Sequence, residues 1–168
     1  MKVLTYGNPV LRKKARKIKN IDKNIVMLSK EMLKIMETNR PQGIGLAGPQ
    51  VGILLAIFVY KLDDDQGVVI NPEIIYREGK EVAEEGCLSI PGVYGPVERA
   101  ERIIVRGLNI KGKRMEWHLS GLKARVFQHE TDHLHGILFT DYIKEIDKLE
   151  VEEGYELPPQ LIDRFREK

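Results

Sequence analysis

Residues 120–136 read SGLKARVFQHETDHLHG, and this stretch carries the start and stop signals of one helix. Ser120 is a preferred N-cap residue, and Gly136 is a preferred residue just beyond a helix C-terminus. About four helical turns separate them. Within those turns four residues recur at helical spacing and predict a stripe that faces the core: Leu122, Val126, His129 and His133. The stretch therefore places two histidines on the buried face of a helix.

The two histidines belong to the pattern H-E-x-x-H. His129 and His133 lie one turn apart, so their ring nitrogens can converge on one metal ion. Glu130 is rotated by about 100° from His129, which leaves it beside the ion, where it can act on a water molecule. A single buried histidine is usually structural, but two histidines with this glutamate between them favour a metal site.

A catalytic metal site of this type needs a third protein ligand and an open position. The candidates for that ligand are His118, His135, Cys87 and the acidic residues after Glu145. A glutamate from residues 150–156 would complete the His2Glu set of a zinc endopeptidase, whereas Cys87 would give a His2Cys set. A glycine directly precedes Cys87, two acidic residues precede that glycine, and a Pro-Gly turn follows. These flanks are more typical of a site than of a buried structural thiol.

The rest of the chain predicts an α+β fold. A helix is expected from about Asp22 to about Thr38, and a short last helix is expected after Pro158-Pro159. Short strands are expected over residues 53–60, 68–70, 74–76, 81–84, 102–106 and 114–119, with a turn at Asn71-Pro72. Helices early and late with strands between them favour antiparallel sheets. We expect one catalytic domain over residues 1–168, in which residues 145–168 form an acidic connector and tail.

Composition and charge narrow the class of protein. Hydrophobic residues make up 42% of the chain and charged residues 31%, which supports a globular core and argues against disorder. The longest apolar run, residues 53–60, is too short to span a bilayer, and the first residues carry no secretion signal. A single cysteine excludes an internal disulfide and favours a reducing, cytoplasmic location. The basic run at residues 12–19 is expected to be solvated, although it could contact RNA or a ribosome.

Three segments of the chain resemble the peptide deformylase family, in the family's order and at its spacing: residues 43–50 (GIGLAGPQ), 85–89 (EGCLS) and 128–134 (QHETDHL). The resemblance implies that Cys87, His129 and His133 bind the metal and that Glu130 is the general acid and base. It implies that the Gln50 side chain and the Leu88 backbone N–H donate to a developing oxyanion. It also implies antiparallel sheets around the central helix that bears the two histidines.

The resemblance further implies hydrolysis of the formyl group from N-formyl-methionyl nascent peptides, with release of formate. Thiolate ligation favours one divalent transition metal such as Fe²⁺, Co²⁺, Ni²⁺ or Zn²⁺, and the resemblance points to Fe²⁺ in cells. An extended peptide could form main-chain hydrogen bonds with the backbone beside the glycines. Side chains of the helix that bears the histidines could form one wall of a pocket for the methionine side chain. The predicted substrate-binding residues are Gly43, Ile44, Gly45, Glu85, Gly86, Leu122, Arg125 and Val126.

Two other functions compete with this hypothesis. The first is a small zinc endopeptidase that uses the H-E-x-x-H helix and a downstream glutamate. The second is a ribosome- or RNA-binding module that uses residues 12–19. For the deformylase we expect nascent peptides as partners and transient contact with the ribosome. We expect neither a membrane nor a specific nucleic acid as a partner.

Overall fold

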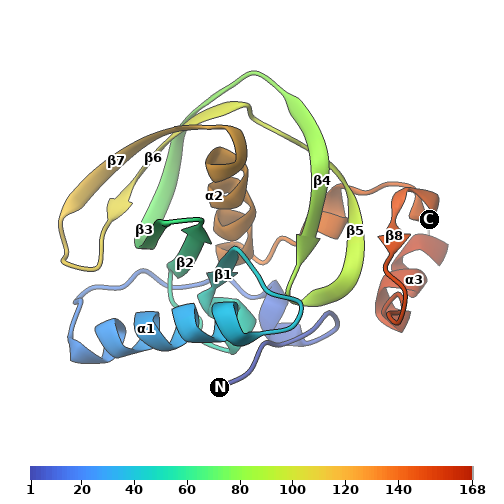
Figure 1. Ribbon diagram of the computed structural model, residues 1–168, viewed down its shortest axis with the longest axis horizontal. Helices are drawn as coiled ribbons and strands as arrows, with labels where there is room; N and C mark the ends of the chain where they lie inside the picture. The colour runs from blue at the N-terminus through green and yellow to red at the C-terminus, as the bar shows by residue number, and fades with distance from the viewer. Residues whose placement is uncertain (168) are drawn as a thin grey trace.

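The computed structural model describes residues 1–167 and contains two antiparallel sheets around a central helix (Figure 1). The α-helices are α1 (Lys23–Thr38), α2 (Gly121–Leu134) and α3 (Pro159–Arg166). The strands are β1 (Gly45–Ala47), β2 (Ile57–Leu62), β3 (Asp65–Glu78), β4 (Glu81–Cys87), β5 (Ile90–Arg99), β6 (Arg102–Leu108), β7 (Arg114–Ser120) and β8 (Glu150–Val151). Short 3₁₀ helices are η1 (Pro9–Arg12), η2 (Gly48–Val51), η3 (Phe139–Tyr142) and η4 (Ile146–Lys148). The predicted α+β fold is confirmed.

The two sheets enclose α2 from different sides. One sheet has the strand order β1-β2-β3-β6-β7 and the other the order β4-β5-β8, and every pairing within them is antiparallel. In Figure 1, α2 stands in the middle, with β3, β6 and β7 on one side, β4 and β5 on the other, and α1 below. The order leaves β1 and β7 at the edges of the larger sheet and β4 and β8 at the edges of the smaller one.

Helix α2 follows the predicted boundaries but is buried more evenly than predicted. Its N-cap is Ser120, and Gly136 has a φ of 74°, the left-handed conformation that ends a helix. Residues from Ala124 to Thr131 are all buried, because sheet surrounds the helix instead of covering one stripe. The prediction that Leu122 faces the core is wrong: it lies in the first turn and is 58% exposed.

Two strand predictions are also wrong. Residues 68–70 and 74–76 belong to one strand, β3, and Asn71-Pro72 is an irregularity within it and not a turn. Asn71 has a φ of 52°, and its side-chain amide exchanges hydrogen bonds of 2.8 and 2.9 Å with the backbone of Ile18.

The Pro91-Gly92 pair lies inside β5, a strand that the sequence analysis did not predict. Short strands β1 and β8 were missed as well, and β2 begins at Ile57 and not at residue 53.

The helices at the two ends of the chain agree with the sequence. The Asp22 side chain accepts a hydrogen bond of 3.1 Å from the Ile25 N–H and so caps α1. Met32 and Met36 anchor α1 in the core, and Leu161 anchors α3. Among residues 1–167, no helix is both long enough and apolar enough to cross a membrane.

Packing around Phe127 joins α2 to the larger sheet. Its ring is fully buried and lies 5.1 Å from the rings of Phe58 and Tyr60 and 5.7 Å from that of Trp117, centroid to centroid. Such close aromatic pairs stabilise the core beyond the area they bury. The contact therefore sets the position of the middle of α2, two residues before His129.

We predict that Phe127→Ala lowers the free energy of unfolding by about 3–5 kcal/mol, because it removes a large buried ring and leaves a cavity. The matched control on the same helix is Leu122→Ala, at an exposed position, which should change the stability by less than about 0.5 kcal/mol. Urea denaturation of both variants measures the difference. Equal stability of the two variants would contradict this account of the core.

Candidate metal centre and pocket

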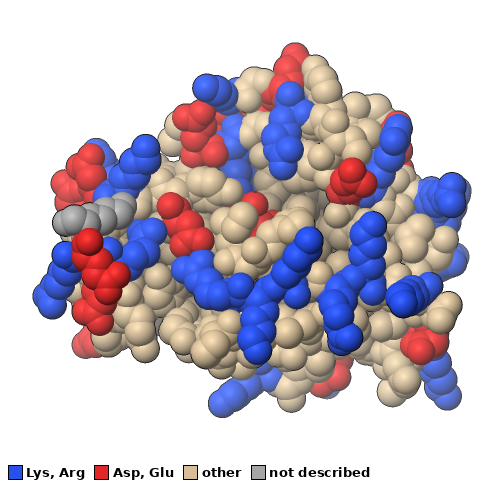
Figure 2. Space-filling model, turned by 180° about the vertical axis from the view of Figure 1, so that it is seen from behind, with Lys and Arg blue, Asp and Glu red and all other residues tan. Residues whose placement is uncertain are grey.

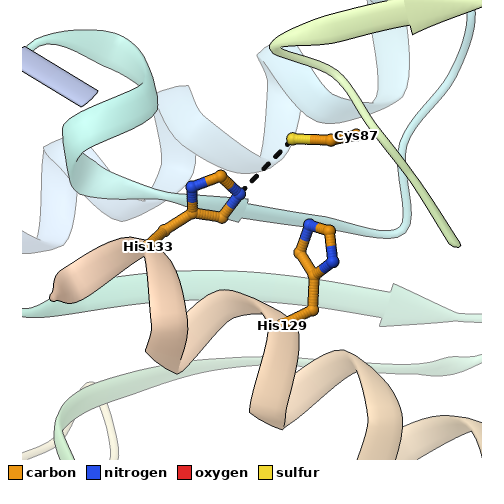
Figure 3. A group of neighbouring side chains, drawn as sticks. All are labelled: Cys87, His129 and His133. Atoms are coloured by element: carbon orange, nitrogen blue, oxygen red, sulfur yellow. Dashed lines mark hydrogen bonds between the residues drawn. The ribbon is translucent and has the colours of Figure 1, made fainter. Parts of the chain in front are cut away.

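The three predicted metal ligands lie together, and two of them, Cys87 and His129, line a pocket (Figure 3 shows the three side chains). Cys87 is the last residue of β4, while His129 and His133 are one turn apart on α2. One ligand atom from each of the three lies within 4.8 Å of the others. The Cys87 Sγ atom is 3.4 Å from the His133 Nε2 atom. Two buried imidazoles and a thiol in this arrangement can hold a transition-metal ion.

The carboxylate of Glu85 determines which nitrogen of His129 faces that centre. Its Oε1 atom lies 2.8 Å from the Nδ1 atom of His129. Since the ionised carboxylate only accepts hydrogen bonds, Nδ1 is the donor and the lone pair of neutral His129 is on Nε2. No local sequence pattern predicts this pairing, because Glu85 lies on β4 and His129 on α2.

Glu85 is itself fully paired. The Arg99 guanidinium donates two hydrogen bonds of 2.9 Å to the carboxylate, and Arg125 donates another of 2.7 Å. Burial alone would raise the pKa of Glu85, but the hydrogen bonds from Arg99 and His129 lower it well below its usual range. Glu85 lines the pocket, as predicted for a substrate-binding residue. Its carboxylate, however, is occupied by these protein side chains, so we assign it a positioning role.

A second carboxylate extends this network to the surface. Arg99 also donates to Asp132, at 2.5 Å, and the Tyr142 hydroxyl donates to the same carboxylate at 2.8 Å. Burial and the hydrogen bond to Asp132 raise the pKa of Tyr142 to about 12. Arg99 was missed by sequence reasoning, because it ends β5, the strand that was not predicted.

Glu130 lies beside the ligands in a buried position. Burial raises its pKa to about 7, against the opposing charge of His129. Its Oε1 atom has no hydrogen-bond partner among residues 1–167. A Cβ atom at Gly45 would lie 2.5 Å from Glu130 Oε2, so glycine is required there for close approach of the carboxylate. The arrangement leaves Glu130 able to exchange a proton inside the pocket.

The amide of Gln50 is held by hydrogen bonds on both of its polar atoms. Its Oε1 atom accepts from the Ala47 N–H at 2.9 Å, and its Nε2 atom donates to Ser89 Oγ at 3.1 Å and to Cys87 Sγ at 3.4 Å. The NH₂ group is therefore aimed at the Cys87 side of the pocket. Leu88 directly follows Cys87, and its side chain packs so closely on Gly43 that a Cβ there would lie 2.6 Å away.

The pocket has a volume of about 270 Å³ and is open to the surface. All predicted substrate-binding residues line it: Gly43, Ile44, Gly45, Glu85, Gly86, Leu122, Arg125 and Val126. Sequence reasoning missed the wall formed by β5, to which Ile90, Gly92, Val93 and Tyr94 contribute. The remaining candidate ligands lie elsewhere: His118, His135 and residues 150–156 are exposed and do not line the pocket.

Charges around the ligands favour a bound cation. Burial lowers the pKa of His129, but the negative groups of Glu130, Cys87 and Glu85 outweigh it and raise the pKa well above its usual value. Burial and the charge of His129 lower the pKa of His133 well below its usual value, which keeps its ring neutral, as ligation requires. The His133 Nδ1 atom is buried without a partner in the described part of the chain. The donor set and its surroundings fit a divalent transition metal.

Comparison with known proteins gives one consistent family. The polypeptide deformylase family matches residues 1–149. The peptide deformylase of Halothermothrix orenii is 45% identical over 148 residues, which cover 87% of this chain and 95% of that protein. The peptide deformylase of Pseudothermotoga lettingae is 47% identical over 144 residues, covering 84% of this chain and 82% of that protein.

Solved structures agree with the sequence comparison. The crystal structure of peptide deformylase from Thermotoga maritima matches with a TM-score of 0.82 at 43% identity, covering 86% of this chain and 97% of that one. The structure of a peptide deformylase from Synechococcus elongatus in complex with actinonin has a TM-score of 0.84 at 39% identity and covers 88% of this chain and 81% of that one. With matches of this identity and coverage, the chain belongs to the polypeptide deformylase family.

Proposed function

We propose that this enzyme hydrolyses the formyl group of N-formyl-methionyl peptides at the group formed by Cys87, His129 and His133. The observation that supports this most directly is the meeting of these three side chains beside a pocket that Cys87, His129 and Glu130 line, in a chain of the deformylase family. Cys87, His129 and His133 would hold one divalent transition metal. When bound there, such an ion lowers the pKa of water and polarises the formyl oxygen.

Glu130 is the residue we assign to proton transfer. Hydrolysis adds water across the formyl C–N bond, so a proton must leave the water and another must reach the departing amine nitrogen. The buried carboxylate accepts the first proton and can then donate it to the amine, which leaves with a free N-terminus as formate is released. A pKa near neutrality suits a group that must do both.

Gln50 and Leu88 are assigned to the oxygen on which negative charge develops. The Gln50 side chain is oriented by the Ala47 N–H, which donates to its Oε1 atom, and by Ser89, which accepts from its NH₂ group. The second hydrogen of the NH₂ group is donated to Cys87 Sγ at 3.4 Å, and this is the hydrogen that would turn to the oxyanion. The backbone N–H of Leu88 is the second proposed donor, in the turn that follows Cys87. Removal of one donor of this type costs about 3 kcal/mol of transition-state stabilisation in comparable sites.

Edge strands β1 and β4 offer backbone to the substrate. Both border the pocket, through Gly45 and Gly86, and each is paired on one side only within its sheet. An extended peptide could add to such an edge through main-chain hydrogen bonds, which read no particular sequence. Leu122, Val126 and the stem of Arg125 form an apolar wall where the methionine side chain is proposed to fit.

The proposed function includes the identity of the metal and the cellular location of the enzyme. We propose Fe²⁺ as the metal in cells, with Zn²⁺, Ni²⁺ and Co²⁺ as other occupants, because a thiolate with two imidazoles suits all four. A ferrous thiolate site is sensitive to oxidation, so a reducing cytoplasm is the proposed location. Because its substrates are nascent chains, we also propose transient contact with the ribosome. The alternative endopeptidase lacks support, since residues 150–156 are exposed and do not line the pocket.

We predict that the purified enzyme holds about one transition-metal ion per chain and that Cys87→Ser and His133→Ala lose most of it, because each removes one of three ligands. His118→Ala is the matched control, since this histidine is exposed and does not line the pocket. Elemental analysis measures the metal. Full metal content in both ligand variants would rule out this ligand set.

Reconstitution with single metals separates Fe²⁺ from the other candidates. Under anaerobic conditions the protein loaded with Fe²⁺ should turn over fastest, and exposure to air should abolish that activity while sparing the protein loaded with Zn²⁺. An air-stable iron form, or a zinc form of higher turnover, would contradict the assignment of iron.

We predict that Glu130→Gln keeps the fold and the metal but lowers kcat by about 10²–10⁴-fold, because an amide cannot accept the proton of water. Glu145→Gln, at an exposed position, should leave kcat unchanged. Steady-state kinetics on a formylated tripeptide, combined with elemental analysis, tests the role. Near-normal kcat in Glu130→Gln would refute the proposed mechanism.

We predict that formyl-Met-Ala-Ser is hydrolysed much faster than acetyl-Met-Ala-Ser, because the additional methyl group must fit between the metal and Leu88. Release of formate or acetate, measured by coupled assay, gives the ratio of kcat/KM. Equal rates on both substrates would contradict formyl selectivity. Cleavage of an internal peptide bond would instead support the endopeptidase.

A further inference from the structure

We infer that residues 13–19 form a docking surface for the phosphate backbone of RNA. The segment contains five cations, Lys13, Lys14, Arg16, Lys17 and Lys19, and all five are exposed. None forms an ion pair with any residue of the described chain, whereas neighbouring Arg12 is paired with Asp141 at 2.7 Å. The segment lies on the side of the molecule seen in Figure 2, where Lys and Arg side chains form a row.

The backbone of this segment is fixed to the core. The Arg16 N–H donates to the Leu54 carbonyl at 3.0 Å, and the Arg16 carbonyl accepts from the Ala56 N–H at 2.7 Å. The Ala15 N–H donates to the Leu134 carbonyl at 2.9 Å, and Ile18 exchanges two bonds with Asn71. The cations therefore project from a rigid, extended support, and binding a partner would not require ordering of this backbone.

The two apolar side chains within the segment point away from any partner. Ala15 and Ile18 are 9% and 6% exposed, so no apolar or aromatic group stands among the cations. A segment that inserts into a membrane surface needs apolar side chains, and a base-reading surface needs stacking or base-edge contacts. A rigid row of unpaired cations alone suits the phosphates of RNA, with little preference for sequence.

The docking surface is separate from the catalytic pocket. None of residues 13–19 lines the pocket, so RNA and peptide could be held at the same time. Its use in the cell rests on the proposed function, because a nascent chain emerges from a particle rich in RNA. Binding itself does not depend on catalysis and can be measured without it.

The test compares two variants that lose the same charge. In the first, Lys13, Lys14 and Lys17 are changed to Gln; in the second, the exposed lysines Lys111, Lys113 and Lys144 are changed to Gln. Fluorescence anisotropy with labelled oligouridylate is recorded between about 50 and 200 mM KCl. Each variant is also assayed for deformylation of formyl-Met-Ala-Ser, which should be unchanged in both and shows that they fold.

The expected result is a linear fall of log K with log salt concentration, with a slope of about −3.5 for the unmodified chain if five phosphates are contacted. Changing the three lysines of the segment should reduce this slope by about 2, and the control variant should keep it. Equal loss in both variants, or no binding by the unmodified chain at about 50 mM salt, would overturn the inference. Tighter binding to phosphatidylglycerol vesicles than to RNA would also overturn it, in favour of a membrane surface.

Discussion

The buried carboxylate of Glu85 connects the smaller sheet to α2 and, through α2, to the metal centre. It lies on β4 and accepts hydrogen bonds from Arg99 of β5 and from Arg125 and His129 of α2. A buried charge is tolerated only when it is fully paired, and loss of one partner costs about 3–5 kcal/mol. This requirement brings the end of β4, with Cys87, to the face of α2 that carries the histidines. The ligand group thus depends on an ion-pair network that binds no metal itself.

The second constraint is close approach of side chains to backbone around the pocket. Gly43, Gly45 and Gly86 each lie where a Cβ atom would overlap a neighbouring side chain, of Leu88, Glu130 and Tyr94 respectively. Because these glycines have no side chain, the neighbouring side chains can reach the pocket. The backbone at the edges of β1 and β4 is also left uncovered by glycine side chains. The glycines around the pocket therefore allow close packing, the placement of Glu130 and the proposed pairing with an extended substrate.

Charged side chains are paired around the metal centre but unpaired along residues 13–19 of the described chain. Behind the metal centre the charge of Glu85 is paired with Arg99 and Arg125 inside the protein. Along residues 13–19 the cations are unpaired while their backbone is fixed, which leaves their charge available to a polyanion. The net charge of +2 does not indicate this basic segment, because acidic residues near the other end of the chain offset its charge.

Local patterns in the amino-acid sequence were enough to predict features that lie within one helix or one turn. Helical spacing placed His129 and His133 together with Glu130 beside them, and Asp22 marked the start of α1, because neighbours within one helix are set by 3.6 residues per turn. The motifs around Cys87 and Gln50 indicated the family, although spacing alone left the third ligand open. Four features became visible only in the folded chain: Cys87 meets the histidines, Arg99 and Arg125 neutralise Glu85, β3 runs through Asn71, and Leu122 is exposed. These facts depend on strand pairing and burial between elements far apart in the chain, which no local pattern encodes.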